Sequence, residues 1–515
     1  MTNKKKLITI IGSTATGKSD LAVQLAKYRD GHVLNADSIQ VYKGLDVISN
    51  KISESEQDSV KHHMMSFLDK DKEYSIPQFI ADSGYLVDKL SAQKTLPVVA
   101  GGTHYYIHHL IFQNNLIKTD EISDKPHSLT ANPHADFYSM ISPLSSSDKD
   151  LIMALPSIKE SQYTNVDSSN TPLYSHLHRI LSLIDPVTAS RWHLRDFRKV
   201  KRSLDIIWEN GRKRSDIEQE QKASKSIDAL SQTKYKNLVF WVYTDPDTLS
   251  KRLERRVEKM TEVCVLLVGS TCLTRAPKQG LLNEIEELRA LENAFISNGQ
   301  QDYTRGLFQA IGYKEFDAYF KATTEKERDE AFKQGLELMK IGTRRYAMKQ
   351  LKWIQNKLLP EIVAHQKSAS SDGVPSSIDI YMVDSSDISR WDEMVVHPAK
   401  DILDSELECG NKFELTKSTE FLNDEPLPDP KSYSEVAERL FSKESKLAAS
   451  NAETGYRKIT CGVCTNDPHN PIVLNEGMEY ENHLSSKAHK AKTRKPTTKP
   501  TQEEIERLRK LKNRV

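Results

Sequence analysis

The chain of 515 residues is too long for one ordinary domain, and its length indicates two to four. Hydrophobic residues make up 37% and charged residues 28%, and the formal net charge of +1 excludes a uniformly basic protein, so contacts with nucleic acid must be local. The longest apolar stretch, residues 263–269, is too short to span a bilayer, and five cysteines exclude a disulfide framework, so we expect an intracellular protein without a membrane segment.

The first 120 residues alternate strand and helix patterns. The apolar run LITIIG at 7–12 predicts a buried strand, and the stretch at 19–29 predicts an amphipathic helix. HVLNADSIQVY at 32–42 and LPVVAGG at 96–102 predict two more strands. This alternation predicts an α/β fold with a parallel sheet.

The segment GSTATGKS at 12–19 lies between the first strand and its helix and follows the G-x-x-x-x-G-K-[ST] pattern of a P-loop. Backbone N–H groups and the helix N-terminus bind an anion in such a loop, a lysine adds charge, and a serine hydroxyl can hold Mg²⁺. The motif leaves open whether a nucleotide or another diphosphate is bound. The residues we expect to bind it are Gly12, Thr14, Ala15, Thr16, Gly17, Lys18 and Ser19.

Polar residues also follow the next two predicted strands. Asp37 and Ser38 lie at the end of the second strand, and Thr103 lies at the end of the third. Because the carboxyl ends of parallel strands line one crevice, we expect them to meet the P-loop around one ligand. Two other interpretations stay open: Asp37 as a turn cap or kinase Mg²⁺ ligand, and Thr103 as a helix N-cap.

Residues 120–172 are rich in Ser, Asp and Pro and predict loop with scattered helix, whereas 172–235 are helical and basic. Further strands are predicted at 236–246 and 374–387, with charged helices between them. Two helical stretches, 196–208 and 338–353, concentrate Lys and Arg. Such clusters fit phosphate contacts with a nucleic acid, although a solvated charged face gives the same pattern.

The last 60 residues contain Cys461, Cys464, His483 and His489, spaced C-x₂-C and H-x₅-H with an 18-residue spacer. Two thiolates and two imidazoles make a closed tetrahedral Zn²⁺ site, so we predict a structural zinc finger. Residues 487–515 contain 11 Lys and Arg but only 3 Glu. This local positive charge favours binding to RNA, and a nuclear localisation patch is the alternative interpretation.

The fold class is thus a P-loop NTPase-like parallel sheet core with a helical insertion and a C-terminal zinc finger. The predicted parts are the first part of the P-loop core at 1–120, the insertion at 121–235, the returning core with basic helices at 236–400, an acidic linker at 401–455, the zinc finger at 456–495 and a basic tail at 496–515.

Several motifs follow one another in a characteristic order: GSTATGKS, ADSIQVYKGLDVISNK, HHMMSFLD, YSIPQF and PVVAGGTHYYI, then DFRKVKRSLDIIWENGRKRSD, YTRGLFQAIGYKEF and TRRYAMKQLKWI. In this order the chain resembles the tRNA dimethylallyltransferase (tRNA isopentenyltransferase) family over most of residues 7–400. The C-terminal module resembles the matrin/U1-type C2H2 finger, which indicates the eukaryotic type.

The resemblance implies that the P-loop holds the diphosphate of dimethylallyl diphosphate, with Mg²⁺, as a leaving group. The acceptor would be the N6 amine of the adenosine 3′ of the anticodon in certain tRNAs, and Asp37 would be its general base. Thr103 would contact the reacting centre, and Arg202 would help to stabilise the diphosphate.

The same resemblance implies contacts with the anticodon stem-loop, where the target base is flipped out of its stack. The residues implied are Asp37, Ser38, Gln40, Arg198, Lys199, Arg344 and Arg345. For the family we expect a monomer that is cytoplasmic, with mitochondrial and nuclear pools as further compartments.

Residues 261–278 depart from the family pattern. They lack the periodicity to continue the preceding charged helix, so we expect them to break it, and we hypothesise that they derive from a wrong or retained splice. Two alternative functions stay open: a P-loop small-molecule kinase, for which Asp37 would be the base for a hydroxyl, and a non-catalytic RNA-binding protein.

Overall fold

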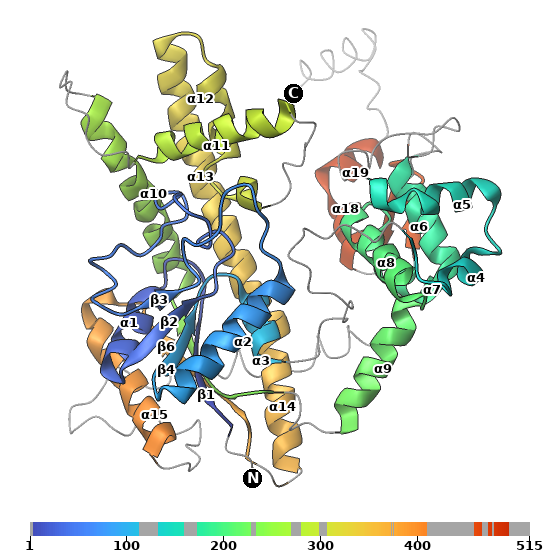
Figure 1. Ribbon diagram of the computed structural model, residues 1–515. Helices are drawn as coiled ribbons and strands as arrows, with labels where there is room; N and C mark the ends of the chain where they lie inside the picture. Colours follow the sequence, from blue (N-terminus) through green and yellow to red (C-terminus); the bar gives the residue numbers. More distant parts are fainter. Residues whose placement is uncertain are drawn as a thin grey trace, which may run out of the picture. The chain divides into compact units, whose positions relative to one another are not determined.

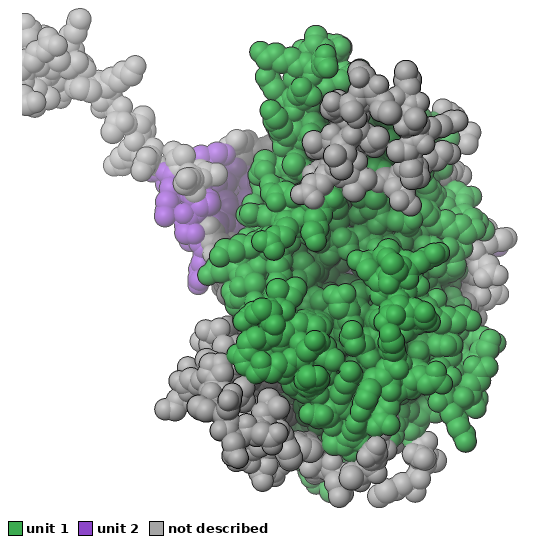
Figure 2. Space-filling view, turned by 90° about the vertical axis from the view of Figure 1, so that its left-hand side faces the viewer, with its two compact units in different colours: residues 1–126, 220–452 green, residues 127–219, 453–515 purple. Residues whose placement is uncertain are grey.

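The computed structural model describes residues 4–112, 132–158, 172–227, 233–268, 280–297, 306–371, 373, 375–408, 458–465, 472–475 and 478–493. The chain forms two compact units, unit 1 from residues 1–126 and 220–452 and unit 2 from residues 127–219 and 453–515 (Figure 1, Figure 2). Most of the predicted linker at 401–455 and the whole tail at 496–515 lie outside the described residues, as do parts of the insertion, so these boundaries stay predictions.

Unit 1 is built on a six-stranded sheet in which every neighbouring pair of strands is parallel, in the order β3-β2-β4-β1-β5-β6. The strands are β1 Lys6–Ile11, β2 Gly31–Asn35, β3 His62–His63, β4 Leu96–Ala100, β5 Lys236–Tyr243 and β6 Ile378–Asp384. The predicted α/β class and five predicted strands are confirmed, whereas the short edge strand β3 was not predicted.

Helices cover both faces of this sheet (Figure 1). Successive side chains of a strand point to opposite faces. Leu7 and Ile11 therefore pack with the helices α2 and α3 on one face, whereas Ile8 and Ile10 pack with α1 on the other. The helices of unit 1 are α1 Lys18–Tyr28, α2 Ile76–Ala92, α3 His104–Ile111, α10 Pro246–Val268, α11 Leu281–Ser297, α12 Asp317–Lys321, α13 Glu325–Trp353, α14 Leu359–Ser371 and α15 His397–Glu408.

A separate apolar cluster joins α10, α11 and α13 to the loop that follows β2. Its members include Val41 and Leu45 from the loop, Val257 from α10, Leu288 from α11 and Met339 from α13. The long helix α13 has a capping box at Thr324, and a π-helical turn, Ile354–Leu358, leads into α14. Helix α13 contributes Met339 to this cluster, and its Leu351 packs against the apolar cluster on one face of the sheet.

Helix α10 continues through residues 261–268 and ends at Val268, so the preceding helix extends eight residues into the segment 261–278 before it ends within that segment. Residues 261–268 contain no Gly or Pro, and extending an existing helix costs far less than starting one. The first strong helix breaker in this segment is Gly269. Residues 269–279 lie outside the described residues, and α11 begins at Leu281.

Unit 2 contains a helical cluster and the Cys/His module. Buried side chains such as Phe137, Leu177, Leu204 and Trp208 form the core of the helical cluster. The elements are α4 Phe137–Ile141, α5 Ser146–Met153, α6 Leu173–Ile184, α7 Pro186–Arg191, α8 Phe197–Asn210, β7 Lys458–Thr460, β8 Val473–Asn475, α18 Met478–Ser485 and α19 Lys487–Thr493, with α9 Arg214–Ile227 at the boundary to unit 1.

None of the helices formed by the described residues has both the length and the apolar character needed to cross a membrane.

Candidate active site and zinc centre

A cavity of about 1230 Å³ lies in unit 1 where the carboxyl ends of β1, β2 and β4 meet. The P-loop lines it from Thr14 to Ser19, as do Asp37, Ser38 and Gln40 after β2 and Gly101 and Gly102 after β4. Helices α10 and α13 supply its opposite wall. Ligands bind at this edge of an open parallel sheet, so the cavity is the candidate active site.

The P-loop has the backbone conformation of an anion-binding turn. Ala15 and Gly17 have φ of 66° and 91°, and Gly17 is the N-cap of α1. A Cβ at Gly17 would lie 2.5 Å from Cη2 of Trp391, which packs on the loop from the segment after β6. Glycine is therefore required at this position by both backbone and space.

Lys18 is nearly buried, and its ammonium donates a hydrogen bond of 2.6 Å to the Ser13 carbonyl. Burial, and then the neighbouring Arg256, lower the pKa of Lys18 to about 7, although Asp37 opposes them. Two cations in a partly desolvated space favour an anion that carries more than one negative charge. A diphosphate meets this requirement.

Arg256 is a site residue that the sequence analysis missed. Its Nη1 donates a hydrogen bond of 2.8 Å to Oγ1 of Thr14, and its buried Nε has no hydrogen-bond partner among the described residues. Burial lowers its pKa to about 10. The usable signal was its position four residues after Arg252 on the face of α10 that carries Leu253 and Val257, since that face packs inward.

Asp37 uses only one of its carboxylate oxygens in its own turn. Oδ1 accepts hydrogen bonds from the N–H groups of Ile39 at 2.9 Å and Gln40 at 3.4 Å. Oδ2 lies next to Gly102, where an added Cβ would be 2.9 Å away. The turn therefore fixes the carboxylate while Oδ2 stays available to accept a proton.

Thr103 contacts Ser38, a residue of the cavity wall. Its Oγ1 accepts the Ser38 N–H at 2.9 Å and donates to the Ser38 Oγ at 3.2 Å. Thr103 is the N-cap residue of α3, so the alternative interpretation of Thr103 as a helix N-cap is confirmed for its position, but its side chain makes no cap hydrogen bond to α3 and binds Ser38 instead. Thr103 is not among the residues that line the cavity, whereas Ser38 is.

Gln40, which lines the cavity, and Gly12, a predicted diphosphate ligand that does not line it, both have partners within the protein. Gln40 donates to the carbonyls of Ser49 at 3.2 Å and Asn50 at 3.3 Å. Gly12 donates its N–H to Nε2 of His104 at 3.3 Å, and burial lowers the pKa of this histidine to about 3, so the ring stays neutral and can accept. The Gly12 N–H is thus directed toward α3.

The basic residues predicted to bind tRNA differ in their surroundings. Arg344 pairs with Glu254 of α10 at 2.9 Å, whereas Arg345 lines the cavity. In unit 2, Lys199 pairs with Asp196 at 2.6 Å and Arg202 lies 3.7 Å from Glu209. Arg198 and Arg202 both belong to α8 of unit 2, so their predicted roles stay predictions.

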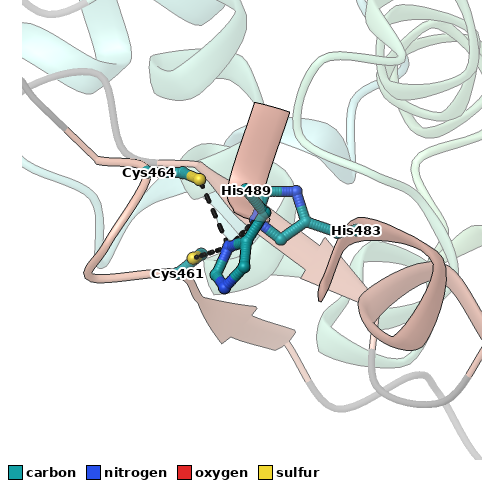
Figure 3. Close-up of side chains that lie close together, drawn as sticks. All are labelled: Cys461, Cys464, His483 and His489. Atoms are coloured by element: carbon teal, nitrogen blue, oxygen red, sulfur yellow. Dashed lines mark hydrogen bonds between the residues drawn. The ribbon is translucent and has the colours of Figure 1, made fainter. Parts of the chain in front are cut away.

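The Cys/His module of unit 2 brings together Cys461, Cys464, His483 and His489 (Figure 3). Their ligand atoms all lie within 4.8 Å of one another. Nδ1 of His489 is 3.4 Å and 3.3 Å from the two sulfur atoms and 3.1 Å from Nε2 of His483. The helix breaks at Ser486 between α18 and α19, which lets both imidazoles turn to one point, and the set suits a structural zinc ion.

Family models match much of the chain. The model described as IPP transferase matches residues 40–267 and 270–357, and the model described as isopentenyl transferase matches residues 5–72. The chain belongs to the IPP transferase family. The IPP transferase match includes Arg256, α13 and most of the segment 261–278, and Asp37 lies in the isopentenyl transferase match. The origin of the segment 261–278 stays a hypothesis.

Relatives of this IPP transferase cover between 78% and 99% of the chain. A tRNA dimethylallyltransferase of Schizosaccharomyces pombe is 33% identical over 99% of this chain and 98% of its own. The human tRNA dimethylallyltransferase is 32% identical over 78% of this chain and 74% of its own. A solved eukaryotic dimethylallyltransferase acting on tRNA matches with a TM-score of 0.65 and 26% identity, over 99% of this chain and 98% of that one.

Proposed function

We propose that the protein transfers the dimethylallyl group of dimethylallyl diphosphate to the N6 amine of the adenosine 3′ of the anticodon in certain tRNAs. The bond between the allylic carbon and the bridging oxygen breaks, a carbon–nitrogen bond forms, and diphosphate leaves. The names of the relatives and the solved enzyme acting on tRNA support this reaction.

One observation carries the proposal: the cavity places a polycationic anion site beside a fixed carboxylate. Lys18 and Arg256 are both partly desolvated cations, and both interact with Asp37. A kinase also combines a phosphate loop with a base, but the family match favours a reaction in which diphosphate leaves and the acceptor loses a proton. Prenyl transfer to an amine meets both conditions.

The residues have separate roles in this reaction. Asp37 takes the proton from the N6 amine through Oδ2 as the carbon–nitrogen bond forms. Lys18, Arg256 and the amides of the P-loop stabilise the charge that develops on the diphosphate. Thr103 positions Ser38 through the bonds described above, and Ser38 then contacts the base.

Oxygen donors that suit Mg²⁺ line the same part of the cavity. They are the Ser19 hydroxyl at the start of α1 and the carboxylates of Asp20 and Asp37. A bound Mg²⁺ would be held by Ser19 with a neighbouring carboxylate, and it would supply positive charge for the leaving diphosphate.

The RNA would approach from the side of α13, because Arg345 of this helix lines the same cavity as Ser38 and Gln40. We assign the basic residues of α8, Arg198 and Lys199, to phosphate contacts and Arg202 to the diphosphate. The zinc module adds a second RNA-binding surface.

The test uses purified protein, dimethylallyl diphosphate, Mg²⁺ and an anticodon stem-loop RNA with consecutive adenosines after the middle base of the anticodon. The nucleosides are analysed by mass for isopentenyladenosine, with the full chain and with residues 261–278 deleted. Product from the full chain supports the proposal. Absence of product from both proteins while RNA still binds would leave the non-catalytic alternative, and ATP turnover with small acceptors would favour the kinase.

A further inference from the structure

Gln350 of α13 is a buried amide that connects two separate loops of the active site, with 4% of the residue exposed. Its Oε1 accepts the backbone N–H of Thr14 in the P-loop at 2.8 Å. Its Nε2 donates to the carbonyl of Gly102, after β4, at 2.8 Å. The side-chain oxygen of Gln350 therefore binds the P-loop, and its side-chain nitrogen binds the loop after β4.

These contacts lie close to both the P-loop, which would bind the diphosphate, and Asp37, the predicted base. A Cβ built on Gly102 would lie 2.9 Å from Nε2 of Gln350 and 2.9 Å from Oδ2 of Asp37. The same carbonyl of Gly102 also accepts the Tyr346 hydroxyl, one turn earlier on α13, at 3.4 Å. The amide of Gln350 thus flanks the predicted base as well as the phosphate loop.

From these contacts we infer that Gln350 is a positioning residue, which sets the separation between the P-loop and the loop beside Asp37. The inference rests on the proposed function. Because Arg345 and Lys349 of the same helix also line the cavity, α13 would connect the RNA side of the cavity to the diphosphate side through this one amide. An apolar side chain could fill the volume of Gln350, but it would leave the Thr14 N–H and the Gly102 carbonyl without these partners.

The substitution Gln350→Glu separates positioning from packing, because it keeps the shape and changes the hydrogen-bonding groups and, when the carboxyl is ionised, the charge. An ionised Glu accepts from Thr14 but cannot donate to Gly102, whereas a protonated Glu does both. The variant should therefore recover as pH falls. The other charged or titratable groups, Lys18, Asp37, His104, Arg256, Tyr346 and Lys349, are present in both proteins, but the introduced carboxylate also shifts their titration. The uncharged variant Gln350→Met therefore separates the loss of the two hydrogen bonds from the added charge.

The experiment measures the single-turnover rate, kcat/KM for dimethylallyl diphosphate and the Kd for the stem-loop RNA, between about pH 6 and pH 8.5, with the full chain. Near pH 8 we expect Gln350→Glu to lose about tenfold or more in kcat/KM, a deficit that shrinks several-fold toward pH 6, with the RNA Kd within about twofold of wild type. Gln350→Met should lose a similar factor at every pH.

The matched control is Gln366→Glu, since Gln366 donates to the Ile378 carbonyl at 3.0 Å from α14 and does not line the cavity. It should follow the wild-type profile. Wild-type kcat/KM in both Gln350 variants, or a Gln350→Glu deficit that is constant with pH, would overturn the inference. If Gln350→Met fails to fold in thermal unfolding, the nearly isosteric Gln350→Glu carries the test alone. A wild type that makes no isopentenyladenosine would instead refute the proposed function.

Discussion

Replacing Arg256 by glutamine should change both the strength and the pH dependence of diphosphate binding. Arg256 donates to Oγ1 of Thr14 at 2.8 Å and reaches the cavity next to Lys18. It is also the second cause, after burial, that lowers the pKa of Lys18 to about 7. The substitution therefore removes one cation from the anion site and raises the pKa of the other.

The expected loss of affinity for diphosphate follows from the interaction that the substitution removes. A hydrogen bond to a charged group contributes about 1.5–3 kcal/mol, which corresponds to about a 10- to 150-fold increase in Kd for diphosphate near pH 6, where Lys18 is largely protonated in both proteins. In the wild type the Lys18 ammonium is lost as pH rises through about 7, so affinity should fall by up to about tenfold per pH unit above it. In Arg256→Gln the Lys18 ammonium persists to higher pH, so the affinity for diphosphate begins to fall at a higher pH than in the wild type. The ratio of the variant Kd to the wild-type Kd therefore decreases as pH rises.

Isothermal titration calorimetry of diphosphate with Mg²⁺, at several values between about pH 6 and pH 9, measures both effects. Arg29→Gln is the control, because Arg29 pairs with Asp404 at the far end of α1. Two pH profiles that stay parallel for wild type and Arg256→Gln would refute the electrostatic coupling. An unchanged Kd at low pH would refute the assignment of Arg256 to the anion site.

Three other predictions concern separate parts of the molecule. Gly17→Ala should weaken diphosphate binding and lower the free energy of unfolding by about 1–3 kcal/mol in denaturant titrations, because its Cβ would meet Trp391 and its φ is positive; unchanged stability would contradict this. Asp37→Asn should reduce the single-turnover rate at saturating dimethylallyl diphosphate by about 10²–10⁴, while calorimetry should show a smaller change in the Kd for diphosphate through the interaction of Asp37 with Lys18 and Arg256; a rate loss that disappears at saturating substrate would count against a base. Cys461→Ser, or zinc chelation, should increase hydrogen exchange at 458–493 but not in the sheet of unit 1; equal exchange with and without metal would exclude a structural zinc site.

The sheet and the P-loop could be predicted because local sequence determines them. A continuous apolar run predicts a strand that is buried on both faces, and β1, β4 and β5 are such runs. The P-loop spacing fixes a strand, a turn and a helix in register. The edge strand β3 has only two residues, His62 and His63, and no periodicity can be read from so short a segment.

The cavity wall opposite the P-loop could not be predicted in the same way. Arg256 and Gln350 lie on two helices far apart in sequence, and both contact Thr14. Only the packing of α10 and α13 around a common apolar cluster brings them to that residue. A pattern within either helix shows an inward face, but it does not show which loop that face meets.

Arg344 and Arg345 of α13 are adjacent in sequence, but the helix points their side chains in different directions. Consecutive residues of a helix point about 100° apart, so Arg344 faces α10 and pairs with Glu254, whereas Arg345 faces the cavity. Both side chains of the Arg344 pair are 41% exposed, and an exposed pair of this kind contributes only about 0–1 kcal/mol. Arg344 can therefore exchange Glu254 for an RNA phosphate at little cost, but part of its charge is already compensated. Among the described residues Arg345 forms no ion pair with a carboxylate, and it lines the same cavity as Asp37 and Ser38, so its full charge faces the proposed site.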